Sequence, residues 1–308
     1  MIKRFAPLVV LAVALLVATS ASAAAPRCFG AAARDPGKPC TNAKLKRTVV
    51  PTVREAPLVR GTPCARLPVE GLLAPCGFGV ADPSAQGFFA LLGDSHAAHW
   101  RPALHALARR EHLRGVQLTR NGCSLTTVAL AAPEPVRADC ASWKAQAIDW
   151  LTRHPEVTTV FLAQKTPDRD DFAPDPEPAF AAQVAGYQEA WRWLPASVQH
   201  VYVLRDTPSM RTSTMSCVSR ALARRRTPGP ACAVPRTVAL PPDPAAAAVA
   251  QQDQQRFTLV DLTPFFCDTR SCYPVVGGVL VHKDVNHITR QFAETLSPYL
   301  ARALDGFA

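Results

Sequence analysis

Short apolar runs alternate with stretches of helical periodicity from about residue 84 to the C-terminus. Phe88 to Leu92 is a continuous apolar run, which is typical of a buried parallel strand. Similar runs predict four further strands, at 116–119, 159–162, 201–204 and 257–260. Apolar residues at helical spacing predict helices at 96–111, 140–153, 179–194, 243–255 and 289–304. This alternation predicts an α/β/α layered domain over 84–308, with a mostly parallel sheet of about five strands. The Pro-rich stretches 166–178 and 227–244 are interpreted as surface excursions between these elements.

The first 83 residues have a different pattern. Residues 1–23 contain Lys3 and Arg4, an apolar run too short to span a bilayer and the small residues 21–23, which together predict a cleaved signal peptide. Residues 24–83 are rich in Pro, Gly and Ala and contain four cysteines, so we expect a disulfide-clipped segment that packs on the main domain. No later stretch is apolar and long enough for a membrane helix. The mature chain is therefore expected to be soluble and extracytoplasmic, either secreted or in the cell envelope.

The ten cysteines agree with export, because an even number in an exported chain suggests disulfides. The sequence does not fix their connectivity. We expect nearest neighbours to pair, because each pair brackets a loop-like segment whose ordering costs conformational entropy. Zinc is the rival interpretation, but no pair has the C-x-x-C spacing of structural zinc sites. The expected bonds are Cys28–Cys40, Cys64–Cys76, Cys123–Cys140, Cys217–Cys232 and Cys267–Cys272.

The chain is basic, with 34 Lys and Arg against 24 Asp and Glu and a formal net charge of +10. Loss of Lys3 and Arg4 with a signal peptide leaves it strongly positive. This charge predicts either a solvated basic surface or a preference for anionic cell-wall polymers. Nucleic acid is not an expected partner, because the protein is predicted to be exported and has no recognisable binding motif.

Two short motifs lie where an α/β/α domain places its active site, beyond the carboxyl ends of strands. The first, Gly93-Asp94-Ser95-His96, follows the first strand and opens a helix, so Ser95 is expected at a helix N-terminus. The second, Asp284-Val285-Asn286-His287, precedes the final helix. A serine nucleophile needs an imidazole to take its proton, and the imidazole needs a carboxylate to orient it. Each motif alone is also compatible with helix capping, but together they predict a Ser95–His287–Asp284 triad.

These motifs together resemble the SGNH (GDSL-type) hydrolase family, in which a GDS serine pairs with a C-terminal D-x-x-H. Residues 92–100 (LGDSHAAHW) and 284–296 (DVNHITRQFAETL) are similar to segments of SGNH domains fused to membrane O-acyltransferases of the acyltransferase 3 family. Further similarities extend the resemblance over nearly the whole mature chain: Cys123, Cys140, Cys267, Cys272, residues 205–208 (RDTP) and residues 28–32 (CFGAA).

The resemblance implies a flavodoxin-like α/β/α fold and chemistry on ester-linked acyl groups, with acetyl expected, of cell-envelope glycans. The triad requires no metal and no organic cofactor. Water as acceptor makes the protein an esterase, and a glycan hydroxyl makes it an O-acyltransferase. Since no membrane-acyltransferase helices are seen in the sequence, the protein acts alone or with a separate membrane acyltransferase. The alternative is a non-catalytic envelope-glycan binding or accessory protein that retains the fold.

The oxyanion hole is less well defined by the sequence. The family takes donors from the serine N–H, here Ser95, from a glycine after the second strand and from an asparagine after the third. Gly122 is suitably placed for the glycine. No G-x-N-D follows the third strand, so the last donor is either missing or supplied by Gln164 or Lys165. Loss of one such donor typically costs about a hundredfold or more in rate.

Several other polar residues lie near the two motifs. Asp94, His96 and Asp206 are expected to line the substrate site, although Asp206 is also compatible with a turn cap. His96 and His99 form a possible metal pair by spacing, but their position beside Ser95 favours lining or packing roles. Trp191 and Trp193 follow a helical pattern and are interpreted as core or helix surface rather than as a sugar platform.

Overall fold

The computed structural model describes residues 25–129, 131–172 and 175–304 of the 308-residue chain. The expected signal peptide, 1–23, lies outside the described residues. The central feature is a seven-stranded sheet in the order β1-β2-β4-β3-β5-β6-β8. Five of its strands are parallel neighbours: β4 (Arg114–Thr119), β3 (Phe88–Gly93), β5 (Thr159–Ala163), β6 (His200–Leu204) and β8 (Phe257–Val260). These are the five strands that the apolar runs predicted.

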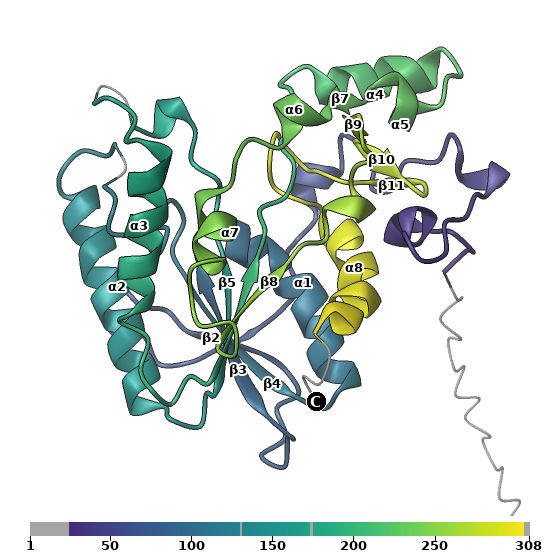
Figure 1. The fold of residues 1–308 in the computed structure, drawn as a ribbon. Coiled ribbons are helices and arrows are strands. Elements are labelled where there is room, and N and C mark those ends of the chain that lie inside the picture. Colours follow the sequence, from purple (N-terminus) through teal and green to yellow (C-terminus); the bar gives the residue numbers. More distant parts are fainter. Residues whose placement is uncertain (1–24, 130, 173–174, 305–308) are drawn as a thin grey trace, which may run out of the picture.

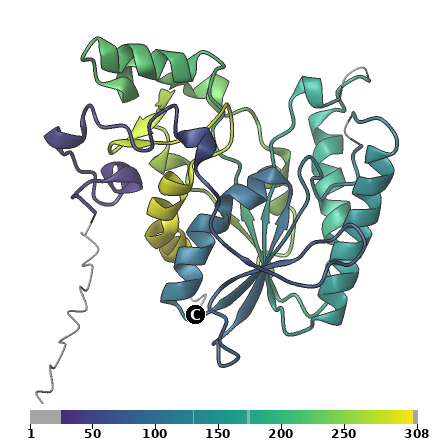
Figure 2. The same ribbon diagram turned by 180° about the vertical axis from the view of Figure 1, so that it is seen from behind.

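Alternate residues of the central strands build two separate cores, one on each face of the sheet. Phe89 and Leu91 of β3 point to one face, which is covered by α1 (Ser95–Arg110) and α8 (Arg290–Ala303). Ala90 and Leu92 point to the other, which is covered by α2 (Val136–Arg153), α3 (Phe180–Trp191) and the short α7 (Pro244–Val249). Figures 1 and 2 show these three layers with the sheet in the middle. The expected α/β/α fold with a mostly parallel sheet is therefore confirmed.

Two strands of the sheet come from the segment before residue 84. β2 (Cys76–Gly79) pairs antiparallel with β4, and β1 (Ala65–Arg66) pairs antiparallel with β2. Neither was predicted, because β1 has two residues and β2 has two glycines among its four, and glycine weakens the strand signal. The central sheet thus extends across the expected boundary at residue 84.

The rest of the N-terminal segment lies along the C-terminal helix and beside the carboxyl ends of the parallel strands. The backbone N–H of Ala31 donates to Thr295 Oγ1 at 3.0 Å, and Asp35 forms an ion pair with Arg302, with its closest oxygen at 2.7 Å. Three 3₁₀ turns account for much of its regular structure: Gly30–Arg34, Ala43–Leu45 and Ala56–Leu58. Packing contacts with α8, rather than local periodicity, position this segment.

A small third cluster lies beyond the carboxyl ends of the parallel strands (Figure 1). It contains α4 (Thr214–Ala223), α5 (Pro228–Ala231) and the hairpin of β10 (Val275–Val276) with β11 (Val279–Leu280). The interpretation of 227–244 as a simple surface excursion was wrong in part, because the stretch also contains β7 (Val234–Pro235), paired with β9 (Ser271–Cys272), and α6 (Arg236–Ala239). The helix expected at 243–255 is shorter than predicted.

Candidate active site

The nucleophile candidate lies at the turn between β3 and α1. Gly93, the last residue of β3, has a φ of +144°, and a Cβ there would lie 2.0 Å from the carbonyl oxygen of Ala163 on β5. Only glycine fits this close approach of two strands. Asp94 then caps α1, accepting a hydrogen bond of 2.8 Å from the backbone N–H of His96. Ser95 is consequently the first residue of the helix, at the carboxyl end of the sheet.

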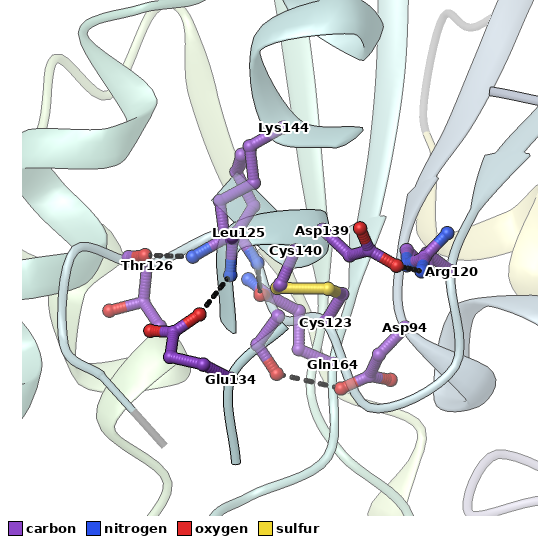
Figure 3. The surroundings of a disulfide bond; sticks show 12 residues. Asp94, Arg120, Cys123, Leu125, Thr126, Glu134, Asp139, Cys140, Lys144 and Gln164 are labelled. Atoms are coloured by element: carbon purple, nitrogen blue, oxygen red, sulfur yellow. Dashed lines mark hydrogen bonds and ion pairs between the residues drawn. A yellow bond between two sulfur atoms is a disulfide. The ribbon is translucent and has the colours of Figure 1, made fainter. Parts of the chain in front are cut away.

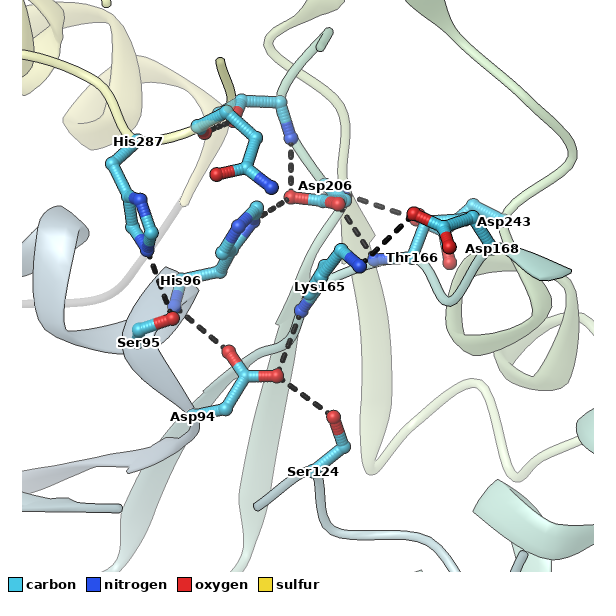
Figure 4. Close-up of polar contacts among 12 residues, drawn as sticks. Asp94, Ser95, His96, Ser124, Lys165, Thr166, Asp168, Asp206, Asp243 and His287 are labelled. Atoms are coloured by element: carbon cyan, nitrogen blue, oxygen red, sulfur yellow. Dashed lines mark hydrogen bonds and ion pairs between the residues drawn. The ribbon is translucent and has the colours of Figure 1, made fainter. Parts of the chain in front are cut away.

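The loop before α8 brings the predicted partners of Ser95 to it. His287 Nε2 lies 2.9 Å from Ser95 Oγ (Figure 4), and His287 Nδ1 lies 2.9 Å from Asp284 Oδ2. Asp284 Oδ1 also accepts the backbone N–H groups of Asn286 at 3.0 Å and His287 at 2.8 Å. One turn therefore holds the carboxylate and the imidazole together, and the ring bridges Ser95 and Asp284.

The hydrogen bonds keep Asp284 ionised. Burial acts to raise the pKa of Asp284, but the hydrogen bonds from the His287 ring and from the two backbone N–H groups outweigh burial and hold the pKa well below its usual value. An ionised carboxylate at Nδ1 fixes the tautomer in which the Nε2 lone pair faces a serine hydroxyl. The arrangement has the chemical parts of a serine acyl-transfer site.

Asp94 is a scaffold residue and does not line the substrate site, contrary to expectation. Its side chain is only 2% exposed. Besides capping α1, it accepts hydrogen bonds from Ser124 Oγ at 2.7 Å and from the backbone N–H of Lys165 at 3.0 Å. The carboxylate thereby connects the loops that follow β3, β4 and β5, which are the loops around Ser95 (Figure 4).

His96 and Asp206 also lie behind the site rather than in its wall. His96 Nδ1 is 2.6 Å from Asp206 Oδ1, and both residues are buried. Asp206 additionally accepts the backbone N–H groups of Thr166 at 2.6 Å and Thr207 at 2.7 Å. Burial acts to lower the pKa of His96, but the charge and hydrogen bond of Asp206 outweigh it, so that the pKa is raised. This pair packs against the site, since the centroids of the His96 and His287 rings are 5.0 Å apart.

A cavity of about 480 Å³ opens at Ser95 and His287. Its walls come from α1, the loop after β4, the loop before α8 and the N-terminal segment. Asn121 and the N-terminal residues Ala56, Val59 and Thr62 line it, and sequence reasoning had assigned no role to them. These residues reach the cavity because two irregular segments pack there. Apolar periodicity does not predict how irregular segments pack.

The family model for the SGNH domain (fused to AT3 domains) matches residues 63–302. This chain belongs to the SGNH domain family. The match confirms the family that the two motifs indicated. It begins at residue 63, so the matched region of this SGNH domain includes β1 and β2 from the N-terminal segment.

One solved structure has a similar fold, and a second matches more weakly. The structure described as the lipopolysaccharide acetyltransferase periplasmic domain of Salmonella ser. Paratyphi A matches with a TM-score of 0.56 and 12% sequence identity, over 74% of this chain and 86% of that one. A carbohydrate esterase family 2 enzyme plus carbohydrate binding domain from Corynascus thermopiles (Myceliophthora fergusii) matches with a TM-score of 0.37 and 14% identity, over 73% of this chain and 69% of that one. No curated protein matches the sequence of this SGNH domain.

Of the residues predicted to form the oxyanion hole of the SGNH domain, Ser95 lines the cavity described above, whereas Gly122, Gln164 and Lys165 do not. Gly122 has a φ of +69° and lines a neighbouring cavity, whereas the preceding Asn121 lines the one at Ser95. Gln164 is buried; its Oε1 accepts the backbone N–H of Leu125, and its Nε2 has no hydrogen-bond partner among the described residues. Lys165 is engaged elsewhere, because its backbone N–H donates to Asp94 and its ammonium binds Asp168 and Asp171. Gln164 thus retains a free donor, and Lys165 is committed to the scaffold.

Two further histidines lie deep beside the triad. His99 is buried, and its ring lies 6.0 Å from that of His287. Burial lowers the pKa of His99 far below its usual value and that of His282 to about 3, so both rings are neutral at pH 7. In the described part of the chain, no group of three or more His, Cys, Asp or Glu side chains is placed to hold a metal ion.

Five disulfides join the ten cysteines of this SGNH domain in the nearest-neighbour pattern. Cys123–Cys140 attaches the loop after β4, which contains Asn121, to α2 (Figure 3). Disulfides are typical of oxidising compartments. Of the helices in the described residues, none has the length and apolar character needed to cross a bilayer.

Proposed function

We propose that this SGNH domain is an exported serine acyl-transfer enzyme that acts on acyl esters of cell-envelope glycans. The observation that carries the proposal is the 2.9 Å separation between His287 Nε2 and Ser95 Oγ, with Asp284 on the other ring nitrogen. The SGNH family and the five disulfides support it. The description of one structural neighbour as a lipopolysaccharide acetyltransferase domain supports acetyl as the acyl group.

The proposed reaction has two steps. Ser95 Oγ attacks the ester carbonyl while His287 Nε2 accepts its proton, and the imidazolium is stabilised by Asp284. His287 then protonates the departing sugar oxygen, which leaves an acyl group on Ser95. In the second step His287 deprotonates water or a glycan hydroxyl, which attacks the acyl-serine. The bond between Ser95 Oγ and the acyl group breaks, and His287 returns the proton to Ser95 Oγ. Water makes the protein an esterase, and a glycan hydroxyl makes it an O-acyltransferase.

Developing negative charge on the carbonyl oxygen needs hydrogen-bond donors. The N–H of Ser95 is one of the first four of α1, which lack intrahelical acceptors, and the helix dipole adds positive potential there. Gly122 N–H and the Asn121 amide are the proposed donors from the loop after β4. The unpartnered Nε2 of Gln164 is the proposed third donor, in the position after β5 where the family has asparagine.

Esterase activity tests this proposal directly. Wild-type protein is expected to release 4-nitrophenol from 4-nitrophenyl acetate and to be labelled by a fluorophosphonate probe, whereas Ser95→Ala is expected to lose both. Exposed Ser84→Ala is the matched control and keeps them. Oligosaccharide acceptors added to the assay separate transfer from hydrolysis, since mass spectrometry detects an acylated glycan only in the former.

A second candidate is a glycan-binding or accessory protein without turnover, which is motivated by the absence of the family's G-x-N-D after the third strand. Equal, negligible rates for wild type and Ser95→Ala, with no labelling of folded and oxidised protein, would favour it. A separate membrane acyltransferase is the proposed partner if transfer is observed, since such a protein could supply the acyl group.

A further inference from the structure

The cavity at Ser95 is lined by three cationic side chains: Arg101 on α1, Lys283 in the loop before α8 and Arg290 at the start of α8. Its one acidic lining residue among those described is Asp284. The ionised carboxylate of Asp284 offsets one of the three positive charges in the lining. The cavity therefore has an excess of positive charge next to the proposed nucleophile.

Arg101 is half buried and has no carboxylate partner among the described residues. Its Nη1 donates to Gln117 Oε1 at 2.8 Å, and its Nη2 donates to the carbonyl oxygen of Thr62 at 2.7 Å. Its Nε is buried and, within the described part of the chain, has no hydrogen-bond partner. A cation removed from water without a counter-charge is costly, and evolution tolerates such cost mainly at functional sites.

The other two cations differ in their partners. Lys283 is exposed, and its ammonium has no hydrogen bond or ion pair with the described residues. Arg290 Nε pairs with Glu294 at 2.7 Å, which leaves the rest of its guanidinium fork for another anion. All three cations line the same cavity as Ser95 and His287.

We propose that the glycan acted on by this SGNH domain is anionic, and that Arg101, Lys283 and Arg290 bind its carboxylate or phosphate group beside the ester that Ser95 attacks. This inference rests on the proposed function, because it names the substrate class of the same site. The cavity volume of about 480 Å³ lies within the usual range for small-ligand pockets, about 300–1,000 Å³. The cations position the anionic sugar, and the triad acts on its acyl group.

The kinetic test compares two substrates that differ in one group. Methyl 3-O-acetyl-glucopyranoside is neutral, and the corresponding methyl 3-O-acetyl-glucuronide has a carboxylate in place of the C6 hydroxymethyl group. The kcat/KM of wild type for release of acetate is expected to be at least about tenfold higher for the glucuronide than for the neutral glucoside. Each partly buried charge pair is expected to contribute severalfold to this ratio. Raising the ionic strength from about 0.05 M to about 0.5 M should reduce this preference, because salt screens it. Equal kcat/KM values at low salt for both substrates and for a 6-phosphate analogue would overturn the inference.

Two double variants test whether the cations of the cavity cause the preference for the anionic substrate. The double variant Lys283→Gln/Arg290→Gln is expected to reduce the ratio of the two kcat/KM values about tenfold. Arg224→Gln/Arg226→Gln removes the same charge from exposed positions outside the cavity and is expected to leave the ratio unchanged. Arg101 is retained in both because it also holds Thr62. An equal fall of the ratio in both double variants would assign the preference to overall charge and contradict the proposed site.

Binding separates this inference from the proposed function. Ser95→Ala cannot form an acyl-enzyme, but its cations are intact, so calorimetry with methyl glucuronide, methyl glucoside 6-phosphate and methyl glucoside measures recognition alone. Tighter binding of either anionic probe supports the site, and the better of the two identifies carboxylate or phosphate. Anion binding without any turnover by wild type would contradict the proposed enzymatic function and support the anion site. Turnover without a preference for the anionic substrate would support the enzymatic function and contradict the anion site.

Discussion

Asp94 and Asp284 are both carboxylates close to Ser95, but they have different tasks. Asp94 is 2% exposed and joins three loops through neutral donors, so it holds the backbone in place. The side chain of Asp284 is 46% exposed and bonds the imidazole that contacts Ser95. Burial and partner type, rather than distance from the nucleophile, distinguish the scaffold carboxylate from the triad carboxylate.

This difference predicts that substitution by asparagine affects activity at Asp284 and stability at Asp94. Asp284→Asn is expected to lower kcat by about 10³- to 10⁴-fold, because an amide cannot maintain the charge or tautomer of His287. Asp94→Asn is expected to lower the free energy of unfolding by about 1–3 kcal/mol, since one buried acceptor oxygen becomes an amide donor facing other donors. Ester hydrolysis and urea denaturation of both variants check this. The assignment fails if Asp94→Asn unfolds like wild type.

The disulfide Cys123–Cys140 is the element that fixes the loop after β4 on α2. Its two cysteines are 17 positions apart in the sequence, and Asn121, which lines the cavity, comes just before the loop that they close. Cys217–Cys232 closes a similar loop, with a separation of 15 residues, in the peripheral cluster around α4 and α5. The two bonds therefore have similar effects on the unfolded chain but different distances from the proposed chemistry.

Removal of either bond is expected to cost roughly 3 kcal/mol of stability, the value typical for loops of this length. Cys123→Ser/Cys140→Ser is additionally expected to lower kcat/KM at a temperature where the protein remains folded, because the loop with Asn121 and Gly122 is then free to move. Cys217→Ser/Cys232→Ser serves as control and keeps wild-type kcat/KM. Thermal unfolding and 4-nitrophenyl acetate hydrolysis measure both effects; equal rates in the two variants would contradict this role.

Elements with strong local patterns were predictable from the sequence, and the others were not. The strand Phe88–Gly93 and the turn at Ser95 have a continuous apolar run and a motif. β2 has glycines at half its positions, and α4 lies beside a Pro-rich stretch. The cavity wall at Ala56 and Thr62 comes from a segment that is held by tertiary contacts. Motifs locate the nucleophile and its imidazole, but burial, which decided the roles of Asp94 and Asp206, requires the folded chain.

At the scale of the whole molecule, buried histidines couple stability to pH. His282 is fully buried, and burial lowers its pKa to about 3. The unfolded chain takes up a proton on this ring near pH 6.5, whereas the folded chain does so only near pH 3. The contribution of His282 is therefore complete above pH 6.5 and is lost as the pH falls towards 3. His96, whose pKa is raised by Asp206, acts in the opposite direction.

His282→Gln removes this linked proton. Between pH 6.5 and 4.5, wild type is expected to lose about 2–3 kcal/mol more stability than the variant, because one extra proton is bound by the unfolded state across two pH units. Urea denaturation at the two pH values measures the difference. Exposed His200→Gln should behave like wild type, since its ring is solvated in both states. An identical pH dependence for His282→Gln and wild type would rule out this coupling.

The N-terminal segment and the C-terminal helix meet across almost the full length of the chain. Asp35 pairs with Arg302, and Thr62 accepts from Arg101 at the cavity. His287, the imidazole that contacts Ser95, is 192 positions further along the chain. A nascent or truncated polypeptide that stops before His287 consequently has a displayed serine but no imidazole beside it and an incomplete wall around it. Reactivity towards esters should thus arise abruptly, only once the final helix has been made and docked.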